Sequence, residues 1–214
     1  MTIRLNGSTS GYTEIDAPAV AGSNTLVLPT GNGSADQALV TNGSGTLSFA
    51  DRTRQVLGTS VASTSGTAID FTGIPSWVKR VTVMLNGVSL SGSSIILIQL
   101  GTSSGVETTG YAGSGSNPGA GIAQQYQSAQ YTTGFGIGQG AGAAVAVSGL
   151  VFITAFGSSN KYIASGTLAS TTEAVTRLTA GDKTLSGTLD RVRITSVNGT
   201  DTFDAGSINI MYEG

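Results

Sequence analysis

The sequence predicts an all-β protein in which a short N-terminal segment of extended pieces precedes an antiparallel β-sandwich of jelly-roll type. Many short segments alternate apolar and polar residues, turn residues separate them, and no stretch has a convincing helical period. The strongest signal lies in residues 74–101, where Val81, Val83 and Leu85 alternate with their neighbours as in a strand with one buried face. The dipeptide Asn86-Gly87 then predicts a tight turn.

Residues 1–52 contain short apolar pieces that are closed by turn residues. Strands of this size bury too little surface to offset their ordering entropy, so the segment needs another surface or copies of itself. We therefore expect Ile15, Leu26 and Leu28 to lie at contacts between subunits.

A boundary is predicted after residue 52, because Asp51, Arg52 and Arg54 raise the local charge density there. This divides the chain into an N-terminal segment, 1–52, and a sandwich, 53–214. The alternative is a solvated turn inside one continuous domain.

The segment 95–100 is apolar on both faces, unlike an ordinary half-exposed strand. A second sheet can cover the face that carries Ile96, Ile98 and Leu100. The opposite face, with Ile95 and Leu97, needs a further layer or a neighbouring subunit, and we expect these two residues at a subunit interface.

Further short strands are expected on both sides of this region, separated by loops rich in Gly, Ser and Thr. These strands are expected within 56–61, 68–71, 145–156, 162–163, 175–178, 185–189, 192–194 and 208–212.

Charge is unusually scarce, with 10% Asp, Glu, Lys and Arg against roughly a quarter in ordinary soluble domains. The surface must therefore consist of uncharged polar residues or be hidden between subunits. Ten scattered Lys and Arg and a pI near 4.9 cannot form a phosphate-neutralising stripe, so nucleic acid is not an expected partner.

The absence of Cys and His removes disulfides, thiol chemistry and the commonest general base and metal ligand. The N-terminus has no apolar signal-peptide region, and the best apolar run, 95–98, is far shorter than the roughly 20 residues of a membrane span. We expect no membrane insertion.

Two loose motifs suggest chemistry but lack the required context. The G-x-G-x-x-A pattern at 138–143 indicates dinucleotide binding only between a strand and a helix. The S-x-x-K spacing of Ser76 with Lys79, and of Ser158 with Lys161, requires a helix that the strand pattern does not offer. We expect no catalytic residue and no cofactor.

Asp201 and Asp204, with Asn198 nearby, offer oxygen ligands, but calcium needs six to eight and no EF-hand-like loop is present. A hydrated turn is the favoured interpretation, so no metal is expected. A carboxylate pair for glycan cleavage can come from distant positions and stays open.

Aromatic side chains beside amide-rich loops are the candidates for binding, because such rings can stack on sugar faces. A neutral surface of this kind suits a glycan receptor. The candidate contacts are Tyr111, Tyr126, Tyr131, Gln125 and Gln127. Core or intersubunit packing is the alternative for the tyrosines and the favoured role of Trp77.

The N-terminal quarter also contains a series of short marks in a fixed order. These marks are 7–11 (GSTSG), 16–18 (DAP), 21–25 (AGSNT), 28–29 (LP), and Leu39 followed by 41–45 (TNGSG). The series resembles the N-terminal motif of many fibre-like structural proteins of tailed bacteriophages, particularly those infecting marine cyanobacteria. This resemblance implies a virion protein made in the host cytoplasm, and the motif occurs at different places on virions.

A second set of marks lies in the remainder of the chain. It comprises 74–75, 78–85, 98–101, 108–111 and 203–206 followed by 208–210. The set resembles the globular heads of phage appendage proteins, which implies a homotrimeric head on a short stalk.

Taken together, the residues and the resemblance lead us to expect a non-enzymatic virion protein. It would be a short homotrimeric fibre or appendage that attaches to other virion proteins of the tail or capsid through residues 1–52 and presents its head to a host-surface glycan. The alternatives are a capsid decoration or head-fibre protein and, from another class, a glycan-cleaving tailspike-like enzyme.

Overall fold

The computed structural model describes residues 3–20, 22–52, 54–118, 127–138, 142, 143, 145–172 and 174–214. These residues form strands, turns and loops with no helix, so the prediction of an all-β protein is confirmed. The chain divides into two compact units, Met1–Thr53 and Arg54–Gly214, which we call the N-terminal unit and the head.

The N-terminal unit contains two separate antiparallel hairpins. One pairs β1 (Ile3–Asn6) with β2 (Tyr12–Ile15), and the other pairs β3 (Gln37–Thr41) with β4 (Leu47–Asp51). Two-stranded hairpins have no second layer against which to bury a face. Accordingly, none of the described residues of this unit is buried.

The head contains a small sheet and a large sheet. The small sheet has the order β10 (Gly105–Val106), β9 (Ile96–Thr102), β17 (Arg191–Ser196) and β7 (Ala68–Thr72), and β13 (Phe135–Gly136) also pairs with β9. The large sheet has the order β12 (Gln127–Tyr131), β11 (Tyr111–Asn117), β16 (Thr176–Thr184), β15 (Lys161–Ser170), β14 (Val147–Ala155), β8 (Arg80–Leu90), β18 (Phe203–Glu213) and β5 (Gln55–Leu57), and β6 (Val61–Ala62) also pairs with β18.

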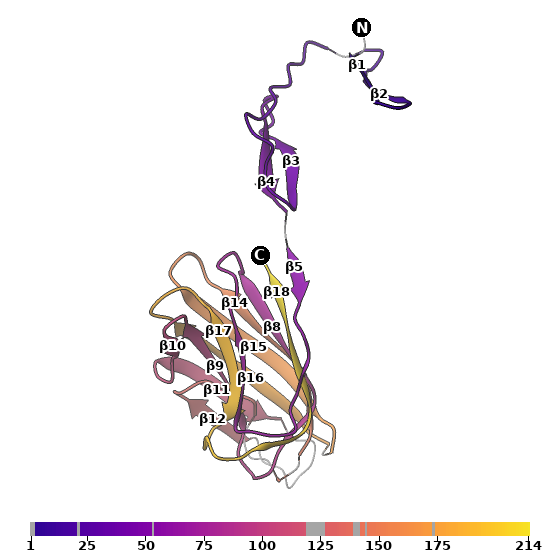
Figure 1. Cartoon of the computed structure of the whole chain (residues 1–214). Helices are drawn as coiled ribbons and strands as arrows, with labels where there is room; N and C mark the ends of the chain where they lie inside the picture. The colour runs from indigo at the N-terminus through magenta and orange to yellow at the C-terminus, as the bar shows by residue number, and fades with distance from the viewer. Residues whose placement is uncertain are drawn as a thin grey trace. The chain divides into compact units, whose positions relative to one another are not determined.

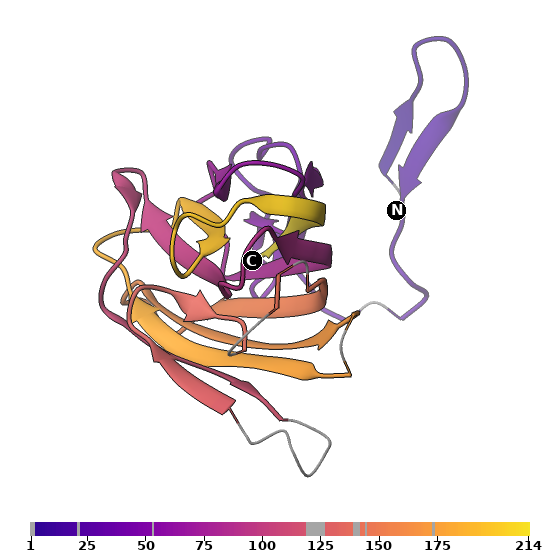
Figure 2. The ribbon, with the colours of Figure 1, turned by 90° about the horizontal axis from the view of Figure 1, so that it is seen from below.

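The two sheets pack over one apolar core (Figures 1 and 2). The alternation read in the sequence explains the burial of β8, because Val81, Val83 and Leu85 all point into this core. Val192 and Ile194 of β17 meet them from the small sheet. Each sheet therefore supplies the covering layer that the other needs.

The central pairs of the head are nested along the chain. The innermost pair joins β14 to β15, and β11–β16, β9–β17 and β8–β18 follow outward in sequence. All four pairs are antiparallel, so most strands meet partners that are distant in sequence.

The Asn86-Gly87 dipeptide does not form the predicted tight turn, because β8 continues through it from Arg80 to Leu90. Gly87 and Gly206 both have positive φ, 63° and 90°, and the register between β8 and β18 shifts between Ala205 and Ser207. A Cβ on Gly206 would collide with the Gly87 backbone. The dipeptide thus lies at a local irregularity of β8, and β8 pairs with β14 and β18 on both sides of it.

Strand β9 is buried on both faces, as its sequence requires. Ile98 belongs to the main core, whereas Ile95 and Leu97 form a second cluster with Tyr131. The expectation that Ile95 and Leu97 need a neighbouring subunit is therefore corrected, because Tyr131 of the same chain covers them. The cover comes from the β11–β12 pair at the edge of the large sheet, in which β12 also contributes Ala129.

We expect Ile98→Ala to lower the free energy of unfolding of the head by about 2–5 kcal/mol, since it leaves a cavity at a fully buried position. The matched variant Ile163→Ala, at a position 43% exposed on the outer face of β15, should change it by less than about 1 kcal/mol. Urea unfolding at one protein concentration, followed by Trp77 fluorescence, measures both. Equal losses would contradict this assignment of the core.

Candidate functional site

The acidic residues considered for calcium are used to tie loops together. One Asp201 oxygen accepts a hydrogen bond from Ser94 N at 2.9 Å, and the other accepts one from Asn198 Nδ2 at 2.7 Å. Asp204 instead accepts a hydrogen bond from Ser89. Within the described residues, no group of three or more acidic, His or Cys side chains could hold a metal ion.

The S-x-x-K residues lie outside any helix. Ser76 is in a turn before β8, and Ser158 is in the β14–β15 turn. Lys161 is at the start of β15 and pairs with Asp182 at 3.1 Å. The G-x-G-x-x-A pattern follows β13, and its residues 139–141 lie outside the described residues.

Tyr111 and Tyr131 do not lie exposed in loops, which corrects their selection as glycan contacts. Tyr111 is 4% exposed, and its hydroxyl accepts a hydrogen bond from Leu100 N at 2.7 Å and donates one to Glu107 O at 2.9 Å. Its ring packs edge-on against Phe135, with 5.1 Å between centroids. Burial raises the pKa of Tyr111 above its ordinary value.

Tyr131 is 8% exposed, and its hydroxyl donates a hydrogen bond to Gly138 O at 2.7 Å. Burial also raises the pKa of this hydroxyl. Because both tyrosine rings are covered by their own chain, neither presents a face to a sugar. Both work as structural anchors, the alternative considered from the sequence.

The structure describes no side-chain surface for the candidate contacts Gln125, Tyr126 and Gln127. Gln125 and Tyr126 lie outside the described residues, and Gln127 is described only as part of β12, without its side chain. Trp77 is partly buried and packs against the main core, with the Arg54 guanidinium 5.6 Å from its ring centroid.

A partly buried ion pair, Lys183 with Glu107, lies at one end of the head. The ammonium group of Lys183, whose side chain is 6% exposed, lies 2.5 Å from Glu107. The backbone N and hydroxyl of Ser186 also donate hydrogen bonds to Glu107, at 2.9 and 2.7 Å. Desolvation opposes ionisation of Glu107, but the hydrogen bonds from Lys183 and Ser186 prevail and lower its pKa below 4.5.

A polar hollow of about 360 Å³ lies at the same end, where three connections between strands meet. Its polar wall includes Ser76 from the β7–β8 connection, Ser103 and Ser104 from the β9–β10 turn, and Ser186, Thr188 and Asp190 from the β16–β17 connection. Sequence reasoning missed this hollow because its walls come from three distant segments of ordinary loop composition.

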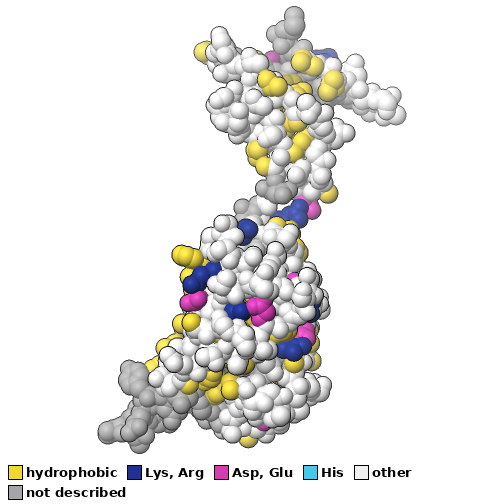
Figure 3. Space-filling model, turned by 90° about the vertical axis from the view of Figure 1, so that its left-hand side faces the viewer, with side chains coloured by type: hydrophobic (Ala, Val, Ile, Leu, Met, Phe, Trp, Pro, Cys, Tyr) yellow, Lys and Arg dark blue, Asp and Glu magenta, His cyan; other side chains and the backbone are white. Residues whose placement is uncertain are grey.

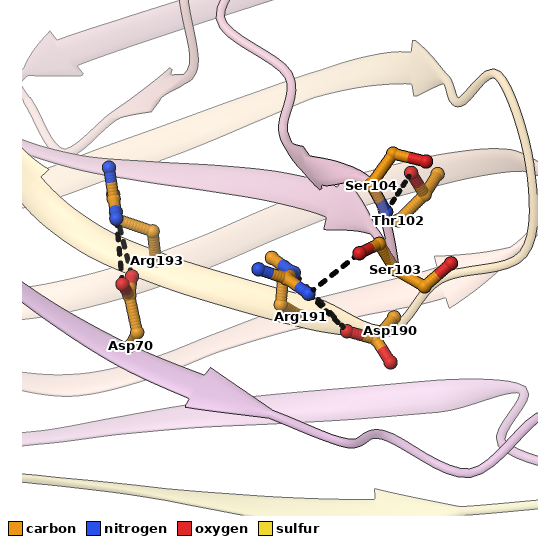
Figure 4. A network of polar contacts seen from close by, with 7 residues as sticks. All are labelled: Asp70, Thr102, Ser103, Ser104, Asp190, Arg191 and Arg193. Carbon is orange, nitrogen blue, oxygen red and sulfur yellow. Dashed lines mark hydrogen bonds and ion pairs between the residues drawn. The ribbon is translucent and has the colours of Figure 1, made fainter.

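Arg191 holds the carboxylate at the rim of the hollow. Its Nε and Nη2 donate to one oxygen of Asp190 at 3.2 and 2.9 Å, and Nη2 also donates to Ser103 O at 3.2 Å. Figure 4 shows Arg191 directed toward both groups. A similar pair, Asp70 with Arg193, joins β7 to β17 with two bonds of 2.7 Å, and neither residue lines the hollow.

A second hollow of about 120 Å³ adjoins the first. The two share Ser76 and Thr188, and the second adds Lys79, Ser158 and Asn160 to the polar lining. Together they place hydroxyl, amide, carboxylate and ammonium groups along one end of the head.

The outer face of the large sheet carries a different kind of surface. A groove of about 620 Å³ runs over β11, β14, β15 and β16 and is lined by Leu150, Phe152 and Leu178 among small residues. Among the residues that the structure describes, no Asp, Glu, Lys or Arg lines this groove. In Figure 3, too, charged side chains are few and scattered on the face that is shown.

The N-terminal residues selected as subunit contacts are all exposed. Ile15, Leu26 and Leu28 have 62%, 67% and 72% of their surface accessible. Ile3, Leu5, Tyr12, Val20, Val27, Leu39 and Val40 are exposed in the same unit. Apolar surface of this extent is unusual on a free monomer.

The lowered pKa of Glu107 predicts an acid-sensitive contribution to stability. A carboxyl with a depressed folded-state pKa stabilises the fold above its ordinary pKa, and this contribution is lost as the pH falls below 4.5 through the lowered value. Glu107→Gln should lower the urea midpoint at pH 7, because Lys183 loses its anionic partner, and should flatten the decline between about pH 5 and 3. Glu14→Gln, in the exposed Arg4–Glu14 pair, is the control. An unchanged acid profile in Glu107→Gln would refute this role.

In the described part of the chain, no helical segment has the length and hydrophobicity that a membrane crossing needs. Comparison of the chain with protein-family models, with curated proteins and with solved structures found no match.

Proposed function

We propose that this chain is a non-enzymatic structural protein of a tailed-bacteriophage virion. It forms a short homotrimeric fibre or appendage, attaches to the particle through residues 1–52, and presents its head to host-surface glycans. The resemblance of the N-terminal marks to phage fibre proteins supports the virion assignment.

The observation that carries the proposal is the lack of a core in the N-terminal unit. None of its described residues is buried, while Ile15, Leu26 and Leu28 are more than 60% exposed. Two hairpins with such surfaces cannot offset their ordering entropy in isolation. Association with copies of the same chain would bury these apolar side chains between subunits.

The topology of the head supports the jelly-roll description. A jelly roll winds paired antiparallel strands so that successive pairs nest. The pairs β14–β15, β11–β16, β9–β17 and β8–β18 follow this order. The large sheet of this head additionally keeps β14 and β15 between β8 and β16.

The low density of charged residues supports the proposal that the chain is part of an assembly. A net charge of −2 and 10% charged residues give little repulsion between copies. The groove lined by Leu150 and Phe152 adds an apolar surface on the head that is compatible with close packing of neighbours.

We expect the full chain to have three times the mass of one 21.4 kDa chain in solution at micromolar concentration. Leu28→Asp should shift this mass toward the monomer, because it places charges in an apolar contact, whereas Thr30→Asp at an exposed neighbouring position should not. Sedimentation equilibrium distinguishes the species. A monomeric wild-type chain would contradict the homotrimer.

We expect antibodies against the head to label purified particles of the virus that encodes the chain. Immunogold electron microscopy places the label on the tail or on the capsid. The purified chain should also leave host envelope polysaccharide intact, as judged by its size distribution. Unlabelled particles would contradict the virion assignment, and specific depolymerisation would contradict the non-enzymatic one.

A further inference from the structure

We propose that the polar hollow beside Asp190 binds a neutral sugar unit of the surface glycan. This inference rests on the proposed function and adds the site and the class of sugar. It differs from the surface expected from the sequence, of which Tyr111 and Tyr131 are buried, while Gln125 and Tyr126 lie outside the described residues.

The donors and acceptors of the hollow match a pyranose. Every sugar hydroxyl both donates and accepts, so a site needs groups of both kinds. Ser103, Ser104 and Thr188 bring hydroxyls that do either, and Asp190 brings a strong acceptor. Within the described residues, the side-chain contacts of Asp190 use Oδ2, which leaves Oδ1 for a ligand.

The carboxylate is held in place before any ligand arrives. Arg191 fixes the Asp190 side chain, while Asp190 N donates to Gly101 O and Asp190 O accepts from Ile74 N, both at 2.9 Å. Behind it, Glu107 fixes Ser186 on the same wall. A site built on such anchored groups loses little entropy when a weak ligand binds.

The size of the hollow fits a short saccharide. Its volume of about 360 Å³ is at the lower end of the range of roughly 300–1,000 Å³ for small-molecule sites. The adjoining hollow, reached across Ser76 and Thr188, offers room for part of a second unit. A glycan chain can therefore run from one hollow into the other.

The charge of the hollow favours a neutral sugar over an acidic one. Asp190 and Arg191 form an ion pair, so their charges largely cancel, and of the two side chains it is the carboxylate, with its Oδ1 oxygen, that belongs to the lining of the hollow. A phosphate or uronate would meet that oxygen and be repelled. Lys79, the cation in the lining, belongs to the second hollow.

Saturation-transfer difference NMR on the full chain tests the proposal with methyl glycosides of glucose, galactose, mannose and N-acetylglucosamine, and with methyl glucuronide as the acidic probe. We expect at least one neutral glycoside to bind with a dissociation constant of roughly millimolar size. Asp190→Asn should weaken that binding at least about tenfold. Thr188→Trp, which fills the hollow from an exposed position, should abolish it.

Two matched controls separate the site from general damage. Asp70→Asn removes the equivalent partner of Arg193 outside the hollow, and Thr200→Trp adds an indole on the exposed β17–β18 loop. Both should bind the glycoside as the wild type does. Sugar binding that persists in Asp190→Asn and Thr188→Trp, or binding of the glucuronide alone, would overturn the inference.

The two proposals fail in different ways. Particles that carry the antibody label, together with a chain that binds none of the neutral glycosides, would overturn the sugar site and leave the virion assignment intact. Unlabelled particles would overturn the virion assignment, whatever the chain binds in solution.

Discussion

The head depends on the burial of β9 on both faces. Ile98 enters the core between the two sheets, while Leu97 on the opposite face requires a separate cover. The β11–β12 hairpin supplies that cover through Tyr131. One apolar strand therefore requires cover on both faces, and Tyr131, a candidate ligand contact in the sequence, is used to complete the fold.

The same strand keeps Tyr131 and Tyr111 out of the accessible surface of the head. Hydroxyl and carboxylate groups instead line the hollow where connections between strands meet. Asp190 directly precedes β17, and its backbone bonds to Gly101 of β9 and to Ile74 of the β7–β8 connection. The N-terminal unit has no such organising strand, and its apolar side chains stay exposed.

Particular residues show how far sequence reasoning reached. The alternation of Val81, Val83 and Leu85 predicts a buried strand face, because the pattern is visible within the strand itself. Asn86-Gly87 predicts a turn, since the dipeptide permits positive φ, but the pairing of β8 with β18 and β14 carries the strand through it. The sequence predicts that Ile95 and Leu97 need a cover, but it does not specify which residues supply that cover.

The amino-acid sequence by itself determined the all-β class and the two-sided burial of β9, because periodicity is a property of short segments. It also determined the scarcity of charge, because composition does not depend on the fold. The tertiary structure decided which chain covers Leu97, whether a tyrosine is exposed, and which loops enclose Asp190. These depend on the nested pairing of strands that are far apart in the chain. A local pattern states that a face must be covered, but only long-range pairing specifies what covers it.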